Sequence, residues 1–199
     1  MTLITEIQYI PSSIIINALG KFTNYRLEQY ERYQKMSFRN RMVVAGAEGP
    51  VNLSIPLANG RNQNCPIREV RICYRENWQL AHWRTISSCY NRSPWFEYFR
   101  DELEKIYQRR IIFLFDWNLE CLNWVFQKLE LRVPISLTES YQARYEGPEF
   151  KDWRNKLLPK TISGFATDAP IYTQVFQERT GFIPGLSVLD YLFCSGKIK

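Results

Sequence analysis

The chain has 199 residues, of which 45% are hydrophobic and 15% aromatic, so it can bury one sizeable core and is expected to fold as a single domain over residues 1–199. Its 9 glycines and 10 prolines are too few for a fibrous or low-complexity protein. The net charge is +6, which fits either an anionic partner or a basic surface that serves only solubility.

The chain is predicted to begin with a strand, a turn and a helix. Residues 3–10 alternate loosely between apolar and polar side chains, as a strand does. A serine precedes the apolar run 14–19 as a candidate N-cap, and Gly20 follows that run as the helix end. Residues 22–31 are again expected to be extended. This order is common at the start of α/β folds.

A basic segment at residues 33–41 leads into a predicted hairpin. The runs 42–45 and 51–57 flank a turn that contains glycine, and apolar and polar side chains alternate along the second run. A polar loop is expected at 58–66 and a short strand at 70–74.

Three helices are predicted between about residues 79 and 131. The first, over 79–90, carries an apolar stripe at helical spacing. Ser93 is the expected cap of the second helix and Pro94 its first residue, with Trp95 on its buried face. The third helix is the longest.

Residues 135–137 are predicted to form a strand and 186–194 a last short helix, and the polar stretch 139–170 is predicted to be a surface loop. The elements together indicate an α/β protein. We expect a three-layer-like open mixed sheet with a helical segment over about residues 79–131, all in a single domain.

The sequence gives no support for a metal site. Its five cysteines are scattered, and a single histidine accompanies them, whereas zinc needs three or four closely spaced ligands. No familiar cofactor motif occurs either, which leaves the cofactor unknown. No window approaches eighteen apolar residues and the N-terminus has no cationic leader, so we expect no membrane span and a cytoplasmic location.

Several short motifs occur in an order that resembles one known family. They are Ile7-Gln8-Tyr9-Ile10-Pro11-Ser12, Tyr33-Gln34-Lys35 with Ser37-Phe38-Arg39-Asn40-Arg41, Leu53-Ser54-Ile55-Pro56-Leu57, Pro66-Ile67-Arg68-Glu69-Val70-Arg71-Ile72, Trp78 with His82-Trp83-Arg84, Ser93-Pro94-Trp95-Phe96-Glu97-Tyr98, Tyr172-Thr173-Gln174-Val175-Phe176 and Gly181-Phe182-Ile183-Pro184. From about residue 7 to residue 196 this order resembles the WbqC-like protein family. The resemblance implies an enzyme of surface-polysaccharide (O-antigen-type) biosynthesis, such as a transferase that acts on an amino-sugar or nucleotide-sugar substrate with an anionic group.

The first candidate for substrate binding is the basic segment, with Tyr33, Lys35, Ser37, Arg39, Asn40 and Arg41. If residues 36–41 are extended, Ser37, Arg39 and Arg41 lie on one face because side chains alternate along a strand. Two guanidinium groups beside a hydroxyl and an amide suit a phosphate or a carboxylate. The alternative is a solvated basic strand edge.

His82 is the only histidine, and therefore the only side chain whose unperturbed pKa suits proton transfer near neutrality. This makes it the candidate catalytic residue. Its stripe also contains Trp78 and Ile86, so the alternative is a neutral core histidine with one hydrogen bond. Arg84, two positions later on another side of the same helix, is a candidate substrate ligand.

Gln8 is a further candidate ligand, because it follows the first strand at the edge where open α/β sheets bind ligands. The free N–H groups at the start of the next helix favour an anion there. The alternative is a tight turn between strand and helix.

Three functions remain open. The first is the surface-polysaccharide enzyme, whose most favoured ligand is an anionic small molecule with a phosphate or carboxylate. The second is a non-catalytic protein that binds a nucleotide or nucleic acid, and the third is an accessory partner of a glycan-assembly enzyme. The oligomeric state is not indicated by the sequence.

Two structural features separate these functions. A long positive groove would favour nucleic acid if it were lined by the aromatics Tyr33, Phe38, Trp78 and Trp83. A cavity would favour the enzyme if it gathered Gln8, Lys35, Arg39, Asn40 and His82.

Overall fold

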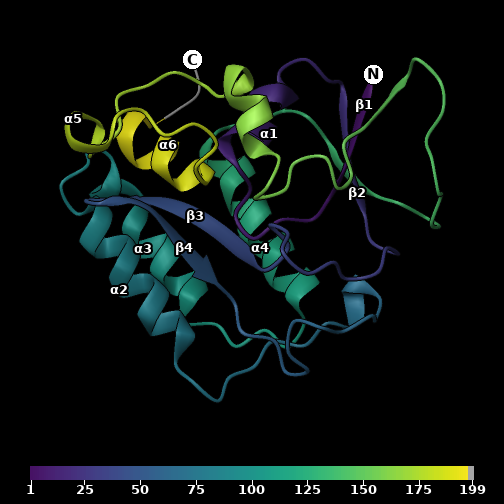
Figure 1. Cartoon of the computed structure of the whole chain (residues 1–199), viewed down its shortest axis with the longest axis horizontal. Helices are drawn as coiled ribbons and strands as arrows, with labels where there is room; N and C mark the ends of the chain where they lie inside the picture. The colour runs from purple at the N-terminus through teal and green to yellow at the C-terminus, as the bar shows by residue number, and fades with distance from the viewer. Residues whose placement is uncertain (197–199) are drawn as a thin grey trace.

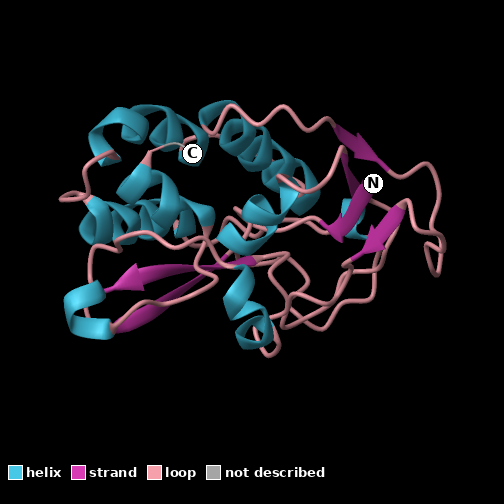
Figure 2. Cartoon of the chain, turned by 90° about the horizontal axis from the view of Figure 1, so that it is seen from above, coloured by secondary structure: helices cyan, strands magenta, loops and turns pink. Residues whose placement is uncertain are grey.

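The computed structural model of the chain describes residues 1–196. Its elements, including two short 3₁₀ helices labelled η, are β1 (Thr2–Glu6), α1 (Ser13–Leu19), β2 (Asn24–Glu28), β3 (Arg41–Gly46), β4 (Gly49–Ser54), η1 (Ile67–Glu69), α2 (Trp78–Tyr90), α3 (Phe96–Tyr107), α4 (Leu114–Lys128), β5 (Ile135–Leu137), β6 (Phe150–Asp152), η2 (Ile162–Asp168), α5 (Gln177–Thr180) and α6 (Val188–Ser195). The predicted α/β class is confirmed. Helices gather at one end of the molecule and the parallel strands at the other (Figures 1 and 2).

The main sheet is parallel and has the strand order β5-β2-β1-β6. β1 lies between β2 and β6, and all five of its residues are buried, as expected of a central parallel strand. Along the chain these are the third, second, first and fourth parallel strands, so the direction of the connections reverses between β1 and β6. In open α/β sheets, ligands bind outside the carboxyl ends of the strands at such a reversal.

The predicted hairpin is confirmed as β3 and β4, whose turn lies between Gly46 and Gly49. Gly49 has a φ of 123°, a value that side chains rarely allow. We expected these strands within one mixed sheet, but they form a separate antiparallel sheet. The reason is their partners: the carbonyl of Val43 accepts from the backbone of Ser187, and β3 packs on α2 and α6 rather than on the parallel strands.

One hydrophobic core joins the two sheets to the helices, which makes the protein a single compact domain. The helices α2, α3 and α4 supply its aromatic side chains, among them Trp78, Phe99 and Trp117. At the other side, α1 begins as predicted, with the Ser12 hydroxyl oxygen accepting a hydrogen bond from the Ile14 N–H. Within residues 1–196, every helix is too short or too polar to cross a membrane.

The second helix of the trio starts later than predicted. Ser93 does not cap it, because its hydroxyl donates to the carbonyl of Tyr90 at the end of α2. α3 begins at Phe96, which takes the buried position that we expected for Trp95, whereas Trp95 is 42% exposed.

Two other local predictions were wrong. Residues 70–74 form only isolated bridges to neighbouring loops instead of a strand. The stretch 139–170 is not a simple loop, because it contributes β6, which pairs with β1, and the helix η2. A strand of three residues with the sequence Phe-Lys-Asp is too short to show an alternating pattern, and its pairing with β1 stabilises it.

Candidate functional site

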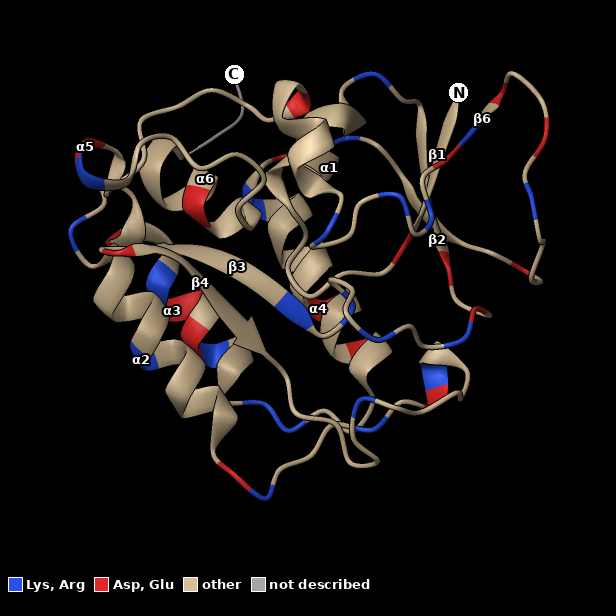
Figure 3. Ribbon diagram, in the orientation of Figure 1, with Lys and Arg blue, Asp and Glu red and all other residues tan. Residues whose placement is uncertain are grey.

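A cavity of about 480 Å³ lies beside the carboxyl ends of β2 and β6, close to the reversal of strand order. Its walls come from the segments that follow these strands and from the loop before β6. The lining residues are Tyr30, Glu31, Arg32, Tyr141, Ala143, Asp152, Arg154 and Asn155. Both acidic and basic residues lie on the segments around this part of the fold (Figure 3).

A buried ion pair forms one wall of the cavity. The Glu31 carboxylate accepts from Arg39 Nε at 2.7 Å and from Nη2 at 2.5 Å, and Arg39 is completely buried. Burial raises the pKa of Glu31, although the charge and hydrogen bonds of Arg39 oppose this shift. Arg39 Nη2 also donates to Asn155 Oδ1 at 2.8 Å, whereas Nη1 has no hydrogen-bond partner among the described residues.

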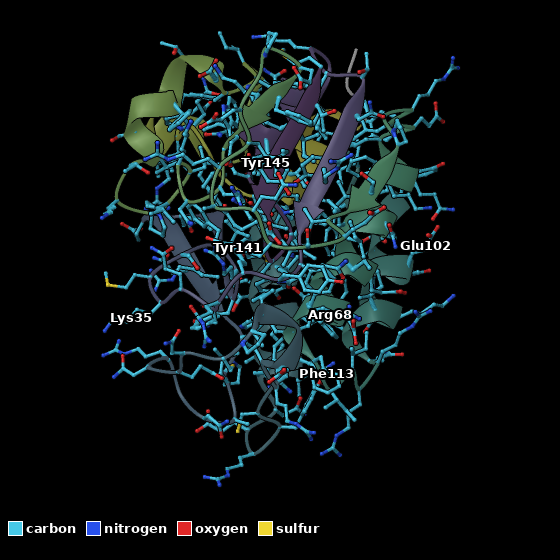
Figure 4. The ribbon with its side chains drawn as sticks, turned by 90° about the vertical axis from the view of Figure 1, so that its right-hand side faces the viewer. Lys35, Arg68, Glu102, Phe113, Tyr141 and Tyr145 are labelled. Atoms are coloured by element: carbon cyan, nitrogen blue, oxygen red, sulfur yellow. The ribbon has the colours of Figure 1, made fainter. Side chains whose placement is uncertain are left out.

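Arg154 holds a second part of the cavity wall together. Its guanidinium donates to Asp152 Oδ2 at 2.6 Å and to Glu28 Oε2 at 3.0 Å. It also lies 4.9 Å from the centre of the Tyr145 ring and 5.7 Å from that of Tyr141, so it fixes the preceding loop through cation–π contacts. Figure 4 shows the two tyrosines on the same side of the molecule. Burial acts to raise the pKa of Asp152, but the hydrogen bonds and charge of Arg154 outweigh it and lower that pKa.

Two further carboxylates, Glu6 and Glu28, end the strands β1 and β2 behind this cavity and are fully buried. Glu6 accepts from the backbone N–H of Asn155 at 2.7 Å and from Gln8 Nε2 at 3.2 Å. Asn155 has a φ of 57°, a left-handed conformation that asparagine tolerates, and it links the end of β1 to Arg39. The site therefore consists of four carboxylates, two buried or half-buried guanidiniums and one amide.

In the described part of the chain, no three histidine, cysteine or acidic side chains are placed to hold a metal ion. The acidic residues of the site are instead directed at arginine and backbone donors. The arrangement is suited to binding polar and charged groups of an organic ligand.

The predicted basic face does not form. Met36 has a φ of 55° and residues 36–41 turn instead of extending, so Ser37, Arg39 and Arg41 do not share one face of a strand. The Ser37 hydroxyl donates to the carbonyl of Gln34 at 2.6 Å. Arg39 is the member of this segment that contacts the cavity wall, where it supports Glu31 and Asn155.

The other predicted ligands of this segment lie apart from the cavity lining. Tyr33 is buried and donates to Asn40 Oδ1 at 3.0 Å, and Asn40 in turn donates to the carbonyl of Ile55. Lys35 is exposed and donates to Asn62 Oδ1 at 3.2 Å. On α2, Arg84 is exposed.

Gln8 and Arg41 lie together at the start of α1, yet the space between them is too small to admit a water molecule. The Gln8 side chain bridges the Glu6 carboxylate and the backbone N–H of Ser12. This corresponds to the tight turn that we considered as the alternative for Gln8.

His82 is 6% exposed and lies in an aromatic cluster rather than in the cavity lining. Its Nδ1 is 3.0 Å from the Tyr9 hydroxyl, which also contacts the Tyr107 hydroxyl. Its ring packs edge-on against the Trp78 ring, with 5.1 Å between the two ring centres. Burial lowers the pKa of His82 to about 4. This environment agrees with the alternative of a neutral core histidine.

The lowered pKa of His82 predicts that acid destabilises the fold. Between pH 6.5 and pH 4 the unfolded chain binds a proton at this residue and the folded chain does not, so stability falls as pH falls through this window. We expect His82 to contribute a loss of about 2 kcal/mol between pH 7 and pH 5. Denaturant unfolding of the wild type and of His82→Gln at both pH values measures this difference. Equal losses in both proteins would contradict it.

The sequence patterns did not reveal Glu31, Asp152, Arg154 and Asn155 as site residues. A signal for the site exists, because Glu6 and Glu28 lie within the two predicted strands, which end at residues 6 and 28 and not at residues 10 and 31 as predicted. Carboxylates at the carboxyl ends of neighbouring parallel strands meet at one edge of the sheet. The strand β6 could not be recognised in the sequence, so the residues at its end and after it could not be predicted to belong to the site.

Comparison with known proteins gives one match. A family model described as the WbqC-like protein family matches residues 15–158, which include both walls of the cavity. No curated protein and no solved structure matches the chain.

Proposed function

Because the chain belongs to the WbqC-like protein family, we propose that it is an enzyme of surface-polysaccharide biosynthesis that binds an amino sugar or a nucleotide sugar in the cavity between Glu31 and Asp152. The expected cavity of Gln8, Lys35, Arg39, Asn40 and His82 does not form, because none of the five lines this cavity. The observation that carries the proposal is instead the position of the cavity at the carboxyl edge of the parallel sheet, beside the reversal of strand order. Its volume of about 480 Å³ lies in the range of small-molecule sites. A cytoplasmic location is part of the proposal.

The groups around the cavity suit a hydroxylated ligand. Carboxylate, amide and guanidinium groups can accept from and donate to sugar hydroxyls, which are both donors and acceptors. Tyr30 and Tyr141 are 43% and 57% exposed and add flat apolar surfaces that a sugar ring can cover. A transferase needs such a site to orient the sugar that receives or loses a group.

The anionic part of a nucleotide sugar is assigned to the basic rim, which we define as Arg32 and Lys35. Arg32 lines the cavity, and its Nη1 donates to the carbonyl of Asn64. Lys35 reaches Asn62 in the same neighbouring loop and lies at one edge of the face seen in Figure 4. A guanidinium and an ammonium that both contact this loop suit a diphosphate.

The alternative of a nucleic-acid-binding protein loses its expected stacking surface. Tyr33, Phe38 and Trp78 are each at most 5% exposed, and Trp83 is half-buried. Base stacking requires exposed aromatic faces. The only remaining support for a nucleic-acid-binding protein is therefore the positive net charge.

A thermal-shift screen tests the proposed function. We expect at least one of the uridine, guanosine or thymidine diphosphate sugars to raise the melting temperature with concentration, since a ligand at 100 times its Kd stabilises the fold by about 2.7 kcal/mol. Ala143→Trp would fill the cavity and should abolish the shift, because Ala143 lines it.

The matched control is Ala58→Trp, which adds the same side chain at an exposed position outside the cavity lining. This variant should keep the wild-type shift. The proposal is wrong if no nucleotide sugar and no free amino sugar stabilises the protein, or if Ala143→Trp responds as the wild type does.

A further inference from the structure

Four carboxylates and two guanidiniums gather at the carboxyl edge of the parallel sheet. Glu6, Glu28, Glu31 and Asp152 lie at or behind the cavity, and the guanidiniums paired with them are those of Arg39 and Arg154. The exposed cations around the same edge are Arg32, Lys35 of the basic rim and Lys156, whose charge acts on Asp152. A gathering of four carboxylates in a chain with a net charge of +6 is a local feature of this site.

Two of the four carboxylates, Glu6 and Glu28, lie outside the cavity lining and bind groups of the protein. Glu28 accepts from Arg154, from the backbone N–H of Tyr30 and from the hydroxyl of Thr138. Glu6 accepts from the backbone of Asn155 and from the Gln8 amide, and among the described residues it forms no ion pair. A buried carboxylate without a direct cationic partner is costly, and a positive group nearby reduces that cost.

Glu31 and Asp152 are the two carboxylates that line the cavity itself. Arg39 uses one acceptor position on each oxygen of Glu31, and a carboxylate oxygen can accept more than one hydrogen bond. Asp152 is partly exposed, with 24% of its side chain open to solvent, and Arg154 leaves it in contact with the cavity. Both can therefore accept hydrogen bonds from a ligand.

We propose that the cavity recognises a primary amino group of its sugar ligand, bound as an ammonium group between the carboxylates of Glu31 and Asp152. This inference rests on the proposed function, because it assigns one chemical group of the substrate to the same cavity. An ammonium has three N–H donors and no acceptor, so it matches two carboxylates and the Asn155 oxygen. A neutral hydroxyl gains less from the negative charge of the carboxylates. The basic rim then takes the phosphate end of the same ligand.

The environments of the two carboxylates add a dependence on pH. Asp152 stays ionised because Arg154 holds its pKa low, whereas burial raises the pKa of Glu31. Glu6 and Glu28 face Glu31 and raise its pKa further, and Arg39 opposes them. Protonation of Glu31 removes one of the two charges, so the preference for the amine weakens as pH falls. It also weakens when the amine itself loses its proton at high pH.

The test compares free sugars with an amino group at carbon 2, 3 or 4 with the corresponding neutral sugars by isothermal titration calorimetry. We expect at least one amino sugar to bind the wild type about tenfold more tightly than its hydroxyl counterpart at neutral pH. In Asp152→Asn this preference should fall below about twofold. Asp152 is partly exposed, so this variant keeps the buried pair of Glu31 and Arg39.

Two further variants complete the test. Glu31→Gln should lose the preference as Asp152→Asn does, provided that it folds. Glu139→Gln changes an exposed carboxylate outside the cavity and should behave as the wild type does. Equal affinity for all amino and neutral sugars, or a preference that survives in Asp152→Asn, overturns the inference and leaves the proposed function standing. Failure of every sugar and every nucleotide sugar to bind overturns both.

Discussion

Replacing Glu31 by alanine is expected to lower the free energy of unfolding by about 3–5 kcal/mol, one of the two largest effects that the structure predicts. The substitution removes both hydrogen bonds to Arg39 Nε and Nη2 and leaves a guanidinium that is 0% exposed without its carboxylate. Because Arg39 Nη1 already lacks a partner, few protein acceptors can replace Glu31. Urea unfolding of the variant and of the wild type measures the loss.

A double-mutant cycle separates the ion pair from the packing of its side chains. Arg39→Met removes the positive charge and keeps a long side chain, so Glu31→Ala in that background should cost much less than it does alone. Glu139→Ala, at an exposed position, should change stability by less than about 0.5 kcal/mol. A loss below about 1 kcal/mol for Glu31→Ala would show that water or another group compensates Arg39.

The same ion pair shows why the site was only partly predictable. The sequence identified Arg39 as a functional candidate by its residue type and neighbours. Its role depends on Glu31, which lies in the irregular segment after β2 and which only the turn at residues 36–41 brings into contact with it. Such a turn, with Met36 at a φ of 55°, has no signature in composition or periodicity.

Elements with a long periodic pattern were predicted well, and those fixed by distant contacts were not. The apolar stripe of α2 shows its helix and the burial of His82 in the sequence alone. β6 exists because Thr2 and Ile4 of β1 offer it a partner, and Asp152, Arg154 and Asn155 take their places only through that pairing. The cavity therefore combines a predictable sheet edge with a wall that local sequence does not encode.

The second large effect concerns Asp190, which is completely buried in α6. Its Oδ1 accepts from the Tyr90 hydroxyl at 2.7 Å and its Oδ2 from the Tyr172 hydroxyl at 2.6 Å. Tyr90 also accepts from the backbone N–H of Ala45 in β3, so one carboxylate links α6, α2, the hairpin and the segment before α5. Burial raises the pKa of Asp190, while the two tyrosine hydroxyls oppose that shift.

Asp190→Ala is expected to lower the free energy of unfolding by about 3–4 kcal/mol, because it removes two hydrogen bonds to a buried carboxylate and leaves two tyrosine hydroxyls without their acceptor. Tyr172→Phe removes only one of these bonds and should cost about 1–2 kcal/mol. Asp101→Ala, at an exposed position of α3, should cost less than about 1 kcal/mol. Asp190 is not among the residues that line the cavity. Asp190→Ala protein that remains folded should therefore bind sugars as the wild type does. A stability change no larger than that of Asp101→Ala would mean that the tyrosines, and not the carboxylate, connect these elements.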